Sequence, residues 1–366
     1  MSAGKDGLRG PGAWLKDRPA GGTVGSEPGA ARGGARRQKA GSSGRAQTMA
    51  EAADKHQLYA QAVQQPRKEV RNLDTIYQTL STRFAARKPS PPSDDGEQRG
   101  WRRHAMVLRE DFCGTAILCA EWVRTRPSTD RRAYGVDIDA SVIRYGREHV
   151  LDGDSGSRVQ LVCGDVLDVG CTDDGADANS DTAGIPRADI IVAFNFSVCY
   201  FSQRSELVQY LRHSLGNLGA CGLFFCDLFG GAEATQSQVS RVCDHGSFKY
   251  LFRRHSFDVA SNTVQLSLGF KMKDGSVLHD CFTYRFRVYT LCEVKEAMLE
   301  AGFDHVSTWI SVRARPDSDS EGADSDKGSS SRDGFGAFAE LRAPMEMPDA
   351  FNAYVVGVKA PRATRP

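Results

Sequence analysis

The most constraining feature of this 366-residue chain is the stretch 107–139, which reads VLREDFCGTAILCAEWVRT and, a few residues later, AYGVDID. An apolar start, a tight turn pivoting on Gly114, a helical segment and a second apolar strand ending at Asp137 predict the first βαβ half of a doubly wound sheet. Such a unit binds a nucleotide-like ligand at the carboxyl ends of its strands. We therefore expect Glu110, Asp111 and Asp137 to lie at an acidic ligand-binding edge.

The turn lacks the glycines that a dinucleotide requires. A dinucleotide fingerprint has three glycines, which let backbone amides close on a pyrophosphate, but Phe112 and Ala116 stand where the other two would fall beside Gly114. A diphosphate therefore fits this acidic turn badly. S-adenosylmethionine carries no phosphate and has two cationic groups, so carboxylates near the turn suit it, and Asp137 can accept hydrogen bonds from both ribose hydroxyls.

With EDFCGTA at this place, the chain resembles the class I S-adenosylmethionine-dependent methyltransferases, and the motif looks like the first motif of one poorly characterised group of them. The resemblance covers residues 58–358. It implies an α/β fold with a doubly wound, seven-stranded, mostly parallel, Rossmann-like sheet whose late strand runs antiparallel. It also implies that the cofactor-binding residues include Gly114, Asp137 and the acidic pair Glu110 and Asp111. Which member of that pair contacts the cofactor stays open.

A third strand is predicted in VQLVCGDV, which ends at Gly164-Asp165. The resemblance puts Asp165 near the adenine amino group and the amide of Val166 against the adenine ring. An Asp after a strand is also common in plain surface turns. The register with Asp137 favours a site, because carboxylates at successive strand ends converge on one crevice.

The catalytic candidate lies after a fourth apolar strand, where ADIIVAFNFSVCYF breaks at Asn195-Phe196-Ser197. In this superfamily that segment faces the transferred methyl group, so the resemblance implies that the Asn195 amide oxygen orients an amine. Enzymes that methylate nucleic-acid bases usually have two prolines after this position. Their absence here weighs against a nucleic-acid base as substrate. The order of the motifs and the antiparallel insert that follows favour a small-molecule acceptor with a nitrogen or oxygen nucleophile.

Residues 248–289 read as strands throughout, with a KDGS hairpin turn between the last two. The resemblance suggests that this antiparallel insert forms a wall of the substrate site. Tyr284 or His279 of the insert, together with Tyr200 from the segment after the fourth strand, are candidates to line that site. Packing is the alternative role for these side chains. The alternative for the insert itself is a covering or dimer-forming sheet, since an exposed sheet edge must be paired or protected.

The predicted methyltransferase domain spans residues 101–360, ends after a helix and two more strands, and is preceded by other segments. Apolar residues recur at helical spacing over 50–87, which predicts two helices that either cover the sheet or close over the cofactor as a lid. The remaining predicted segments are a disordered basic Gly/Ala/Arg-rich tail at 1–48, a linker at 88–100, and polar loop insertions at 168–187 and 314–335.

Composition narrows the remaining choices. A formal net charge of +1 gives no field that would argue for nucleic acid or a membrane as partner, and no apolar run approaches the ~20 residues that span a bilayer. Ten cysteines without metal-like spacing predict reduced thiols, no metal site and a cytoplasmic protein, with organellar targeting by the Arg-rich start as the alternative. The oligomeric state stays open. So do three other functions: an RNA or protein methyltransferase, a nucleotide-binding oxidoreductase, and a non-catalytic protein that retains the fold.

Overall fold

A computed structural model of the protein describes residues 47–85, 104–127, 130–171, 184–312 and 336–361. The predicted linker, nearly all of the predicted tail and most of both polar insertions lie outside these ranges.

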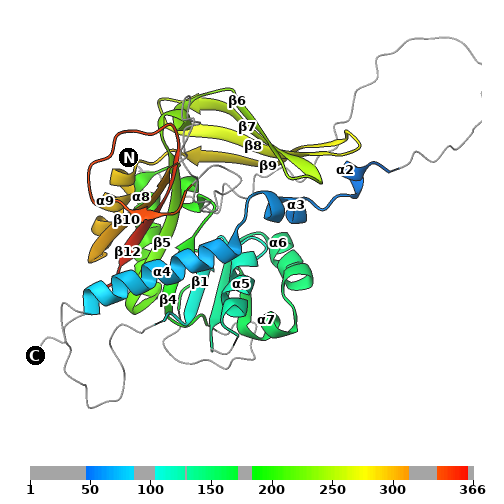
Figure 1. Ribbon diagram of the computed structural model, residues 1–366. Helices are drawn as coiled ribbons and strands as arrows, with labels where there is room; N and C mark the ends of the chain where they lie inside the picture. The colour runs from blue at the N-terminus through cyan, green and yellow to red at the C-terminus, as the bar shows by residue number, and fades with distance from the viewer. Residues whose placement is uncertain (1–46, 86–103, 128–129, 172–183, 313–335, 362–366) are drawn as a thin grey trace, which may run out of the picture.

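Eight strands form the larger sheet, in the order β11-β10-β12-β5-β4-β1-β2-β3 (Figure 1). The strands β1 to β5 are mutually parallel, and β12 runs antiparallel to both β5 and β10. This arrangement confirms the predicted mostly parallel sheet with one reversed late strand. The two-residue β11 is the one strand beyond the seven predicted. The strands are β1 (Val107–Asp111), β2 (Arg132–Asp137), β3 (Val159–Cys163), β4 (Ala188–Ala193), β5 (Leu218–Gly230), β10 (His305–Val312), β11 (Ala339–Glu340) and β12 (Phe351–Val358).

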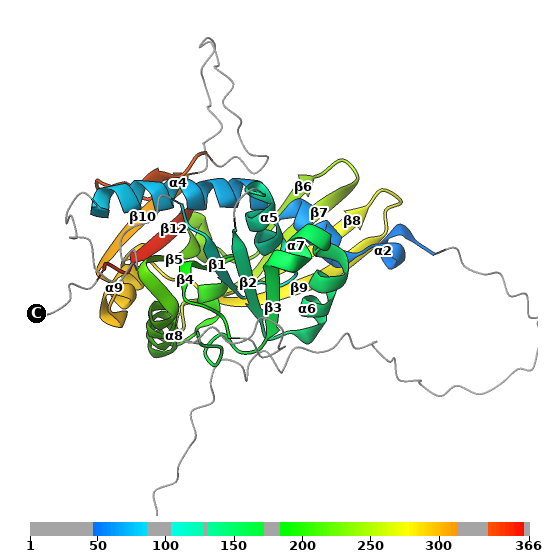
Figure 2. The ribbon, with the colours of Figure 1, turned by 90° about the horizontal axis from the view of Figure 1, so that it is seen from below.

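Helices cover both faces of this sheet (Figure 2). Ile190 and Val192 of β4 are buried in the core that contains α4 and α5, whereas Ile191 and Ala193 are buried in the core that contains α8 and α9. The strands are therefore apolar on both faces, as buried parallel strands usually are. The helices are α4 (Pro66–Ala85), α5 (Ile117–Thr125), α8 (Arg204–Asn217) and α9 (Leu291–Ala301), and α9 has the predicted Thr290–Glu293 capping box.

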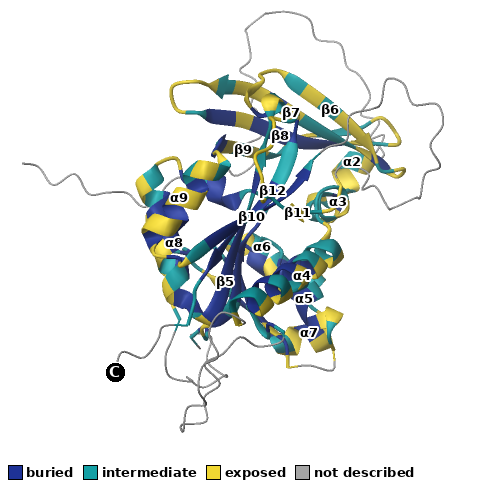
Figure 3. Cartoon of the chain, turned by 60° about the vertical axis from the view of Figure 1, so that its left-hand side comes forward, coloured by how far each residue is buried: buried dark blue, intermediate teal, exposed yellow. Residues whose placement is uncertain are grey.

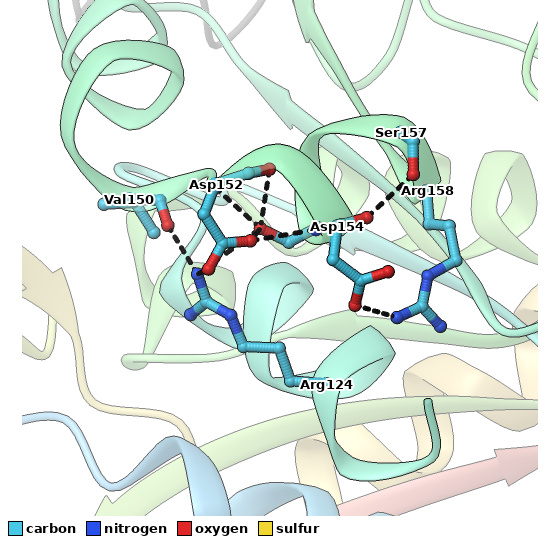
Figure 4. Close-up of polar contacts among 7 residues, drawn as sticks. Arg124, Val150, Asp152, Asp154, Ser157 and Arg158 are labelled. Carbon is cyan, nitrogen blue, oxygen red and sulfur yellow. Dashed lines mark hydrogen bonds and ion pairs between the residues drawn. The ribbon is translucent and has the colours of Figure 1, made fainter. Parts of the chain in front are cut away.

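Beside β2 and β3, α6 (Ala140–Tyr145) continues into a π-helical turn (Gly146–Val150), and the six-residue α7 (Gly153–Arg158) follows. The Arg124 guanidinium donates to the Val150 carbonyl at 2.9 Å and to the Asp152 carboxylate at 2.8 Å (Figure 4). These contacts fasten the end of α5 to the start of α7. Sequence patterns do not predict α7, because GDSGSR has no apolar periodicity.

Four antiparallel strands form a second sheet in the order β6-β7-β8-β9, at the carboxyl ends of the parallel strands (Figure 1). The sheet starts nine residues earlier than the predicted insert, because β6 lies outside the predicted range. Four of the six β6 residues are exposed (Figure 3), so this edge strand carries little apolar signal. The strands are β6 (Val239–Asp244), β7 (Phe248–Asp258), β8 (Thr263–Met272) and β9 (Val277–Arg287).

The helices predicted over 50–87 are present and divide between the two sheets. Helix α4 packs across the larger sheet, whereas α2 (Met49–Ala52) and α3 (Lys55–Ala62) contact the smaller one. Leu58 of α3 is buried against Phe248 and Phe270 of that sheet. Within the described ranges, none of the helices is long and apolar enough to cross a membrane.

Candidate cofactor and substrate site

The turn after β1 has an unusual backbone. Phe112 and Ala116 both have φ of 60° and Gly114 has φ of 53°, so three of its five residues adopt the left-handed conformation. This conformation costs a non-glycine residue about 1–2 kcal/mol. A Cβ on Gly146 would lie 2.8 Å from the Thr115 carbonyl oxygen, so the helical segment after β2 packs directly on the turn. A Cβ on Gly114, by contrast, would have no atom within 4 Å, because this residue faces open space.

Asp137 at the end of β2 is joined to this turn. One carboxylate oxygen accepts the Gly114 amide at 2.8 Å, and the other accepts the Asp139 amide at 2.9 Å. A carboxylate can accept up to about four hydrogen bonds, so these two contacts are compatible with ligand hydroxyls at the same group. The two motifs on which the sequence prediction depends thus meet at one point.

The two acids at the end of β1 point to opposite faces of the sheet. Asp111 is fully buried on the α8 face, where it pairs with Arg109 at 2.7 Å and accepts the Tyr210 hydroxyl at 2.9 Å. Glu110 lies on the α4 face and accepts the Cys119 amide at 3.2 Å. Asp111 therefore has its two oxygens occupied inside the core, and Glu110 is the acid that faces the N-terminal helix.

Three carboxyl groups gather on the α4 face: Glu69 of α4, Glu110 of β1 and Asp227 of β5. Burial raises the pKa of Glu110 to about 8, and the charges of Glu69 and Asp137 add to the effect. Burial raises the pKa of Glu69 and that of Asp227 to about 7, and the charge of Glu69 contributes at Asp227. Poorly solvated carboxylates that repel one another are stabilised by a proton or by a cation. Glu69 was not among the predicted site residues, because helical periodicity does not say which strand ends a helix will face.

Asn195 follows β4 at the same edge of the sheet. Asn195 and Phe196 are both left-handed, with φ of 58° and 60°, and both of their backbone amides donate to the Asp227 carboxylate, at 3.0 and 2.7 Å. The Ser197 hydroxyl donates to the Phe194 carbonyl at 2.6 Å and closes the turn. The predicted catalytic position therefore lies in a second strained turn, beside the carboxyl cluster.

A cavity of about 970 Å³ lies between the ends of β1 to β3 and the smaller sheet. Asp165 and Val166 line it, and so do Tyr200 and Tyr284, whose ring centroids are 6.4 Å apart. One oxygen of Asp165 accepts the Leu167 amide at 2.9 Å, which shapes the turn after β3. The other predicted site residues are not among the described residues that line this cavity: Glu110, Asp111, Gly114, Asp137, Asn195 and His279.

The smaller sheet supplies the polar wall of the cavity. His255, Gln265 and Arg285 line it together with Arg287, which forms an ion pair with Glu293 at 3.2 Å. Of these lining residues the sequence predicts Tyr284, but not His255 or the two arginines. Alternate residues along a strand share a face of the sheet, but which face meets the cavity depends on how the sheet docks.

The part of the chain that the structure describes contains no group of three or more His, Cys, Asp or Glu residues that could hold a metal ion. All ten cysteines are free thiols.

No protein-family model and no curated protein matches the sequence. Among solved structures, the chain is similar to the CcbJ methyltransferase from Streptomyces caelestis, with 12% identity, a TM-score of 0.48, and coverage of 81% of this chain and 98% of the other. It is also similar to CalS10, an amino pentose methyltransferase from Micromonospora echinaspora, with 12% identity, a TM-score of 0.47, and 83% and 96% coverage. The sugar N-methyltransferase KedS8 from a Streptoalloteichus species has 13% identity, a TM-score of 0.47, and 93% and 100% coverage.

Proposed function

We propose that this protein transfers the methyl group of S-adenosylmethionine to a small-molecule acceptor with a nitrogen or oxygen nucleophile. The observation that carries the proposal is the bond between the Gly114 amide and the Asp137 carboxylate. It joins a glycine-poor, left-handed turn after the first strand to an acid at the end of the second. This edge suits a cofactor with a ribose and cationic groups better than one with a pyrophosphate.

The residues present fit the parts of that cofactor. Asp137 would hold the ribose hydroxyls, and Asp165 with Val166 would hold the adenine at the cavity wall. Glu110, rather than Asp111, whose two oxygens are occupied by Arg109 and Tyr210 on the opposite face, would face the cationic methionine end, with Glu69 beside it. The open space at Gly114 leaves room for the ligand against the backbone. When bound, the cofactor supplies an electrophilic methyl group, and the protein aligns the acceptor with it in a site that excludes water.

The acceptor would occupy the part of the cavity that the smaller sheet encloses. A volume of about 970 Å³ lies at the upper end of the ~300–1,000 Å³ typical of ligand pockets and leaves room for a small acceptor beside a cofactor. Helix α3 would act as part of a lid, since it contacts the smaller sheet and its Asp54 accepts the Tyr145 hydroxyl of α6. Within this function, we propose membership of the methyltransferase group that has an EDFCGT-type first motif.

Titration of the purified full-length chain with S-adenosylhomocysteine and with NAD tests the proposal. We expect saturable binding of S-adenosylhomocysteine and none of NAD over the same concentration range. The opposite preference would identify a nucleotide-dependent oxidoreductase. Failure to bind either ligand would favour a non-catalytic protein with this fold.

A further inference from the structure

The turn at Asn195-Phe196 is strained at Phe196. Two consecutive non-glycine residues adopt the left-handed conformation; Asn tolerates it well, whereas it costs Phe196 about 1–2 kcal/mol. Such conformations persist only where the surroundings enforce them, and they are concentrated at functional sites. Ser197 closes the turn from below, and the Phe196 ring packs edge-on against Phe229 at 5.0 Å, but neither contact holds the two strained amides.

Asp227 on the neighbouring strand β5 holds both amides. Each of its carboxylate oxygens accepts one of them, so a single side chain fixes two consecutive peptide groups. The group lies on the poorly solvated α4 face, where an ionised carboxylate is costly unless hydrogen bonds compensate it. An Asn side chain at this position has only one acceptor oxygen, so it could accept one of the two amides. Its NH2 group, which is a donor, would then face the other backbone N–H.

We infer that Asp227 is a positioning residue that locks the Asn195-Phe196 turn and thereby directs the Asn195 side chain to the methyl-transfer position. The inference rests on the proposed function. Asp227 acts through the backbone of the turn and does not itself contact the acceptor. A merely structural Asp227 would support folding but would leave recognition at the methyl position unchanged.

Sinefungin provides an acceptor-independent readout, because it carries an amine where S-adenosylmethionine carries the transferable methyl group and S-adenosylhomocysteine carries neither. The quantity to measure is the ratio of the affinities of the full-length chain for sinefungin and S-adenosylhomocysteine. We expect Asn195→Ala to lower this ratio by about ten- to a hundredfold, through the loss of a hydrogen bond to a charged amine. Asp227→Asn should lower it equally, and the double variant should lower it no further.

Asp189→Asn is the control. Asp189 also accepts two backbone amides, those of Met106 and Val107 at 2.8 and 3.0 Å, but it does so with a single carboxylate oxygen and at the opposite end of β4. The same change of charge at this distant acid should keep the ratio. If Asp227→Asn does not fold, Asp227→Glu keeps the charge but displaces it by a methylene group, and it should lower the ratio in the same direction.

Two outcomes overturn the inference: a wild-type ratio in the folded Asp227 variant, or a double variant whose loss is the product of the two single losses. The proposed function fails separately, if wild-type protein does not bind S-adenosylhomocysteine at all.

Discussion

At the scale of single residues, the carboxylate of Asp137 has two backbone partners and a proposed ligand partner at once. We expect Asp137→Ala to lower the affinity for S-adenosylhomocysteine by about ten- to a hundredfold, because it removes charge-assisted bonds to the ribose and releases the Gly114 amide. Asp137→Asn keeps one acceptor oxygen and should lose less. Calorimetric titration measures both. Asp139→Asn is the control, because Asn still caps α6; an equal loss there would mean that the effect is not specific to Asp137.

Gly114 tests whether the open space beside the turn belongs to the ligand. Its φ is 53° and a Cβ there would have no atom within 4 Å, so Gly114→Ala should cost only about 1–2 kcal/mol of stability, and the protein should fold. We expect its S-adenosylmethionine affinity to fall nevertheless. Gly275→Ala in the β8–β9 hairpin is matched to it, since Gly275 has φ of 85° and equally open surroundings. Equal affinities for the two variants would remove the turn from the proposed site.

The raised carboxyl pKa values predict that cofactor binding releases protons. Near pH 7 the Glu110 carboxyl, with a pKa of about 8, is mostly protonated, and those of Glu69 and Asp227, with a pKa of about 7, are partly so. A bound cation favours the ionised form and lowers these pKa values, so roughly one proton should leave per S-adenosylmethionine bound. Calorimetry in buffers of different ionisation enthalpy measures it. S-adenosylhomocysteine, which lacks the sulfonium, should release fewer, and proton uptake would contradict the arrangement.

At the scale of elements, α3 is held to the smaller sheet chiefly by Leu58, which is 8% exposed. Leu58→Ala should weaken this docking by about 2–3 kcal/mol, and because Leu58 is the one buried residue of the eight-residue α3, we expect local detachment rather than global unfolding. Hydrogen exchange of the α3 amides should accelerate while that of β4 stays slow. Leu299→Ala, at a 46% exposed position of α9, is the control and should change neither.

The sequence predicts elements where burial is strong and fails where it is weak. The parallel strands are apolar on both faces, and α9 carries a capping box and a terminal glycine. The local sequence is therefore enough to predict strands in the first case and a helix in the second. The exposed strand β6 and the Gly-rich α7 have no such pattern. Strand order alone places Asp137 at the carboxyl ends of the parallel strands, beside the turn after β1. Glu69 could not be placed in this way, since its position beside Glu110 depends on how α4 crosses the sheet.

At the scale of the whole molecule, we propose that residues 1–46 are dispensable for folding and cofactor binding. The first described contacts begin just after them: Thr48 caps α2 in a reciprocal pair with Glu51, and the Met49 amide donates to Asp274 at 2.8 Å. A chain shortened to begin at Gln47 should keep the melting temperature and the S-adenosylhomocysteine affinity of the full chain. One that begins at Met49 loses the Thr48 cap, worth about 1 kcal/mol locally. Aggregation of the Gln47 form would contradict the proposal.

The two walls of the cavity are encoded differently along the chain. The wall at the edge of the larger sheet takes a few residues from each of several strand ends, such as Phe112 after β1, Ile138 after β2 and Asp165 after β3, so a change there involves distant parts of the sequence. The opposite wall is a single uninterrupted insert, β6 to β9, between β5 and α9. Exchange of that one stretch for a sheet of different lining would alter the shape and polarity of the cavity and leave the Gly114–Asp137 junction in place. The proposed acceptor side of the cavity can therefore be redesigned, or diverge in evolution, as a module.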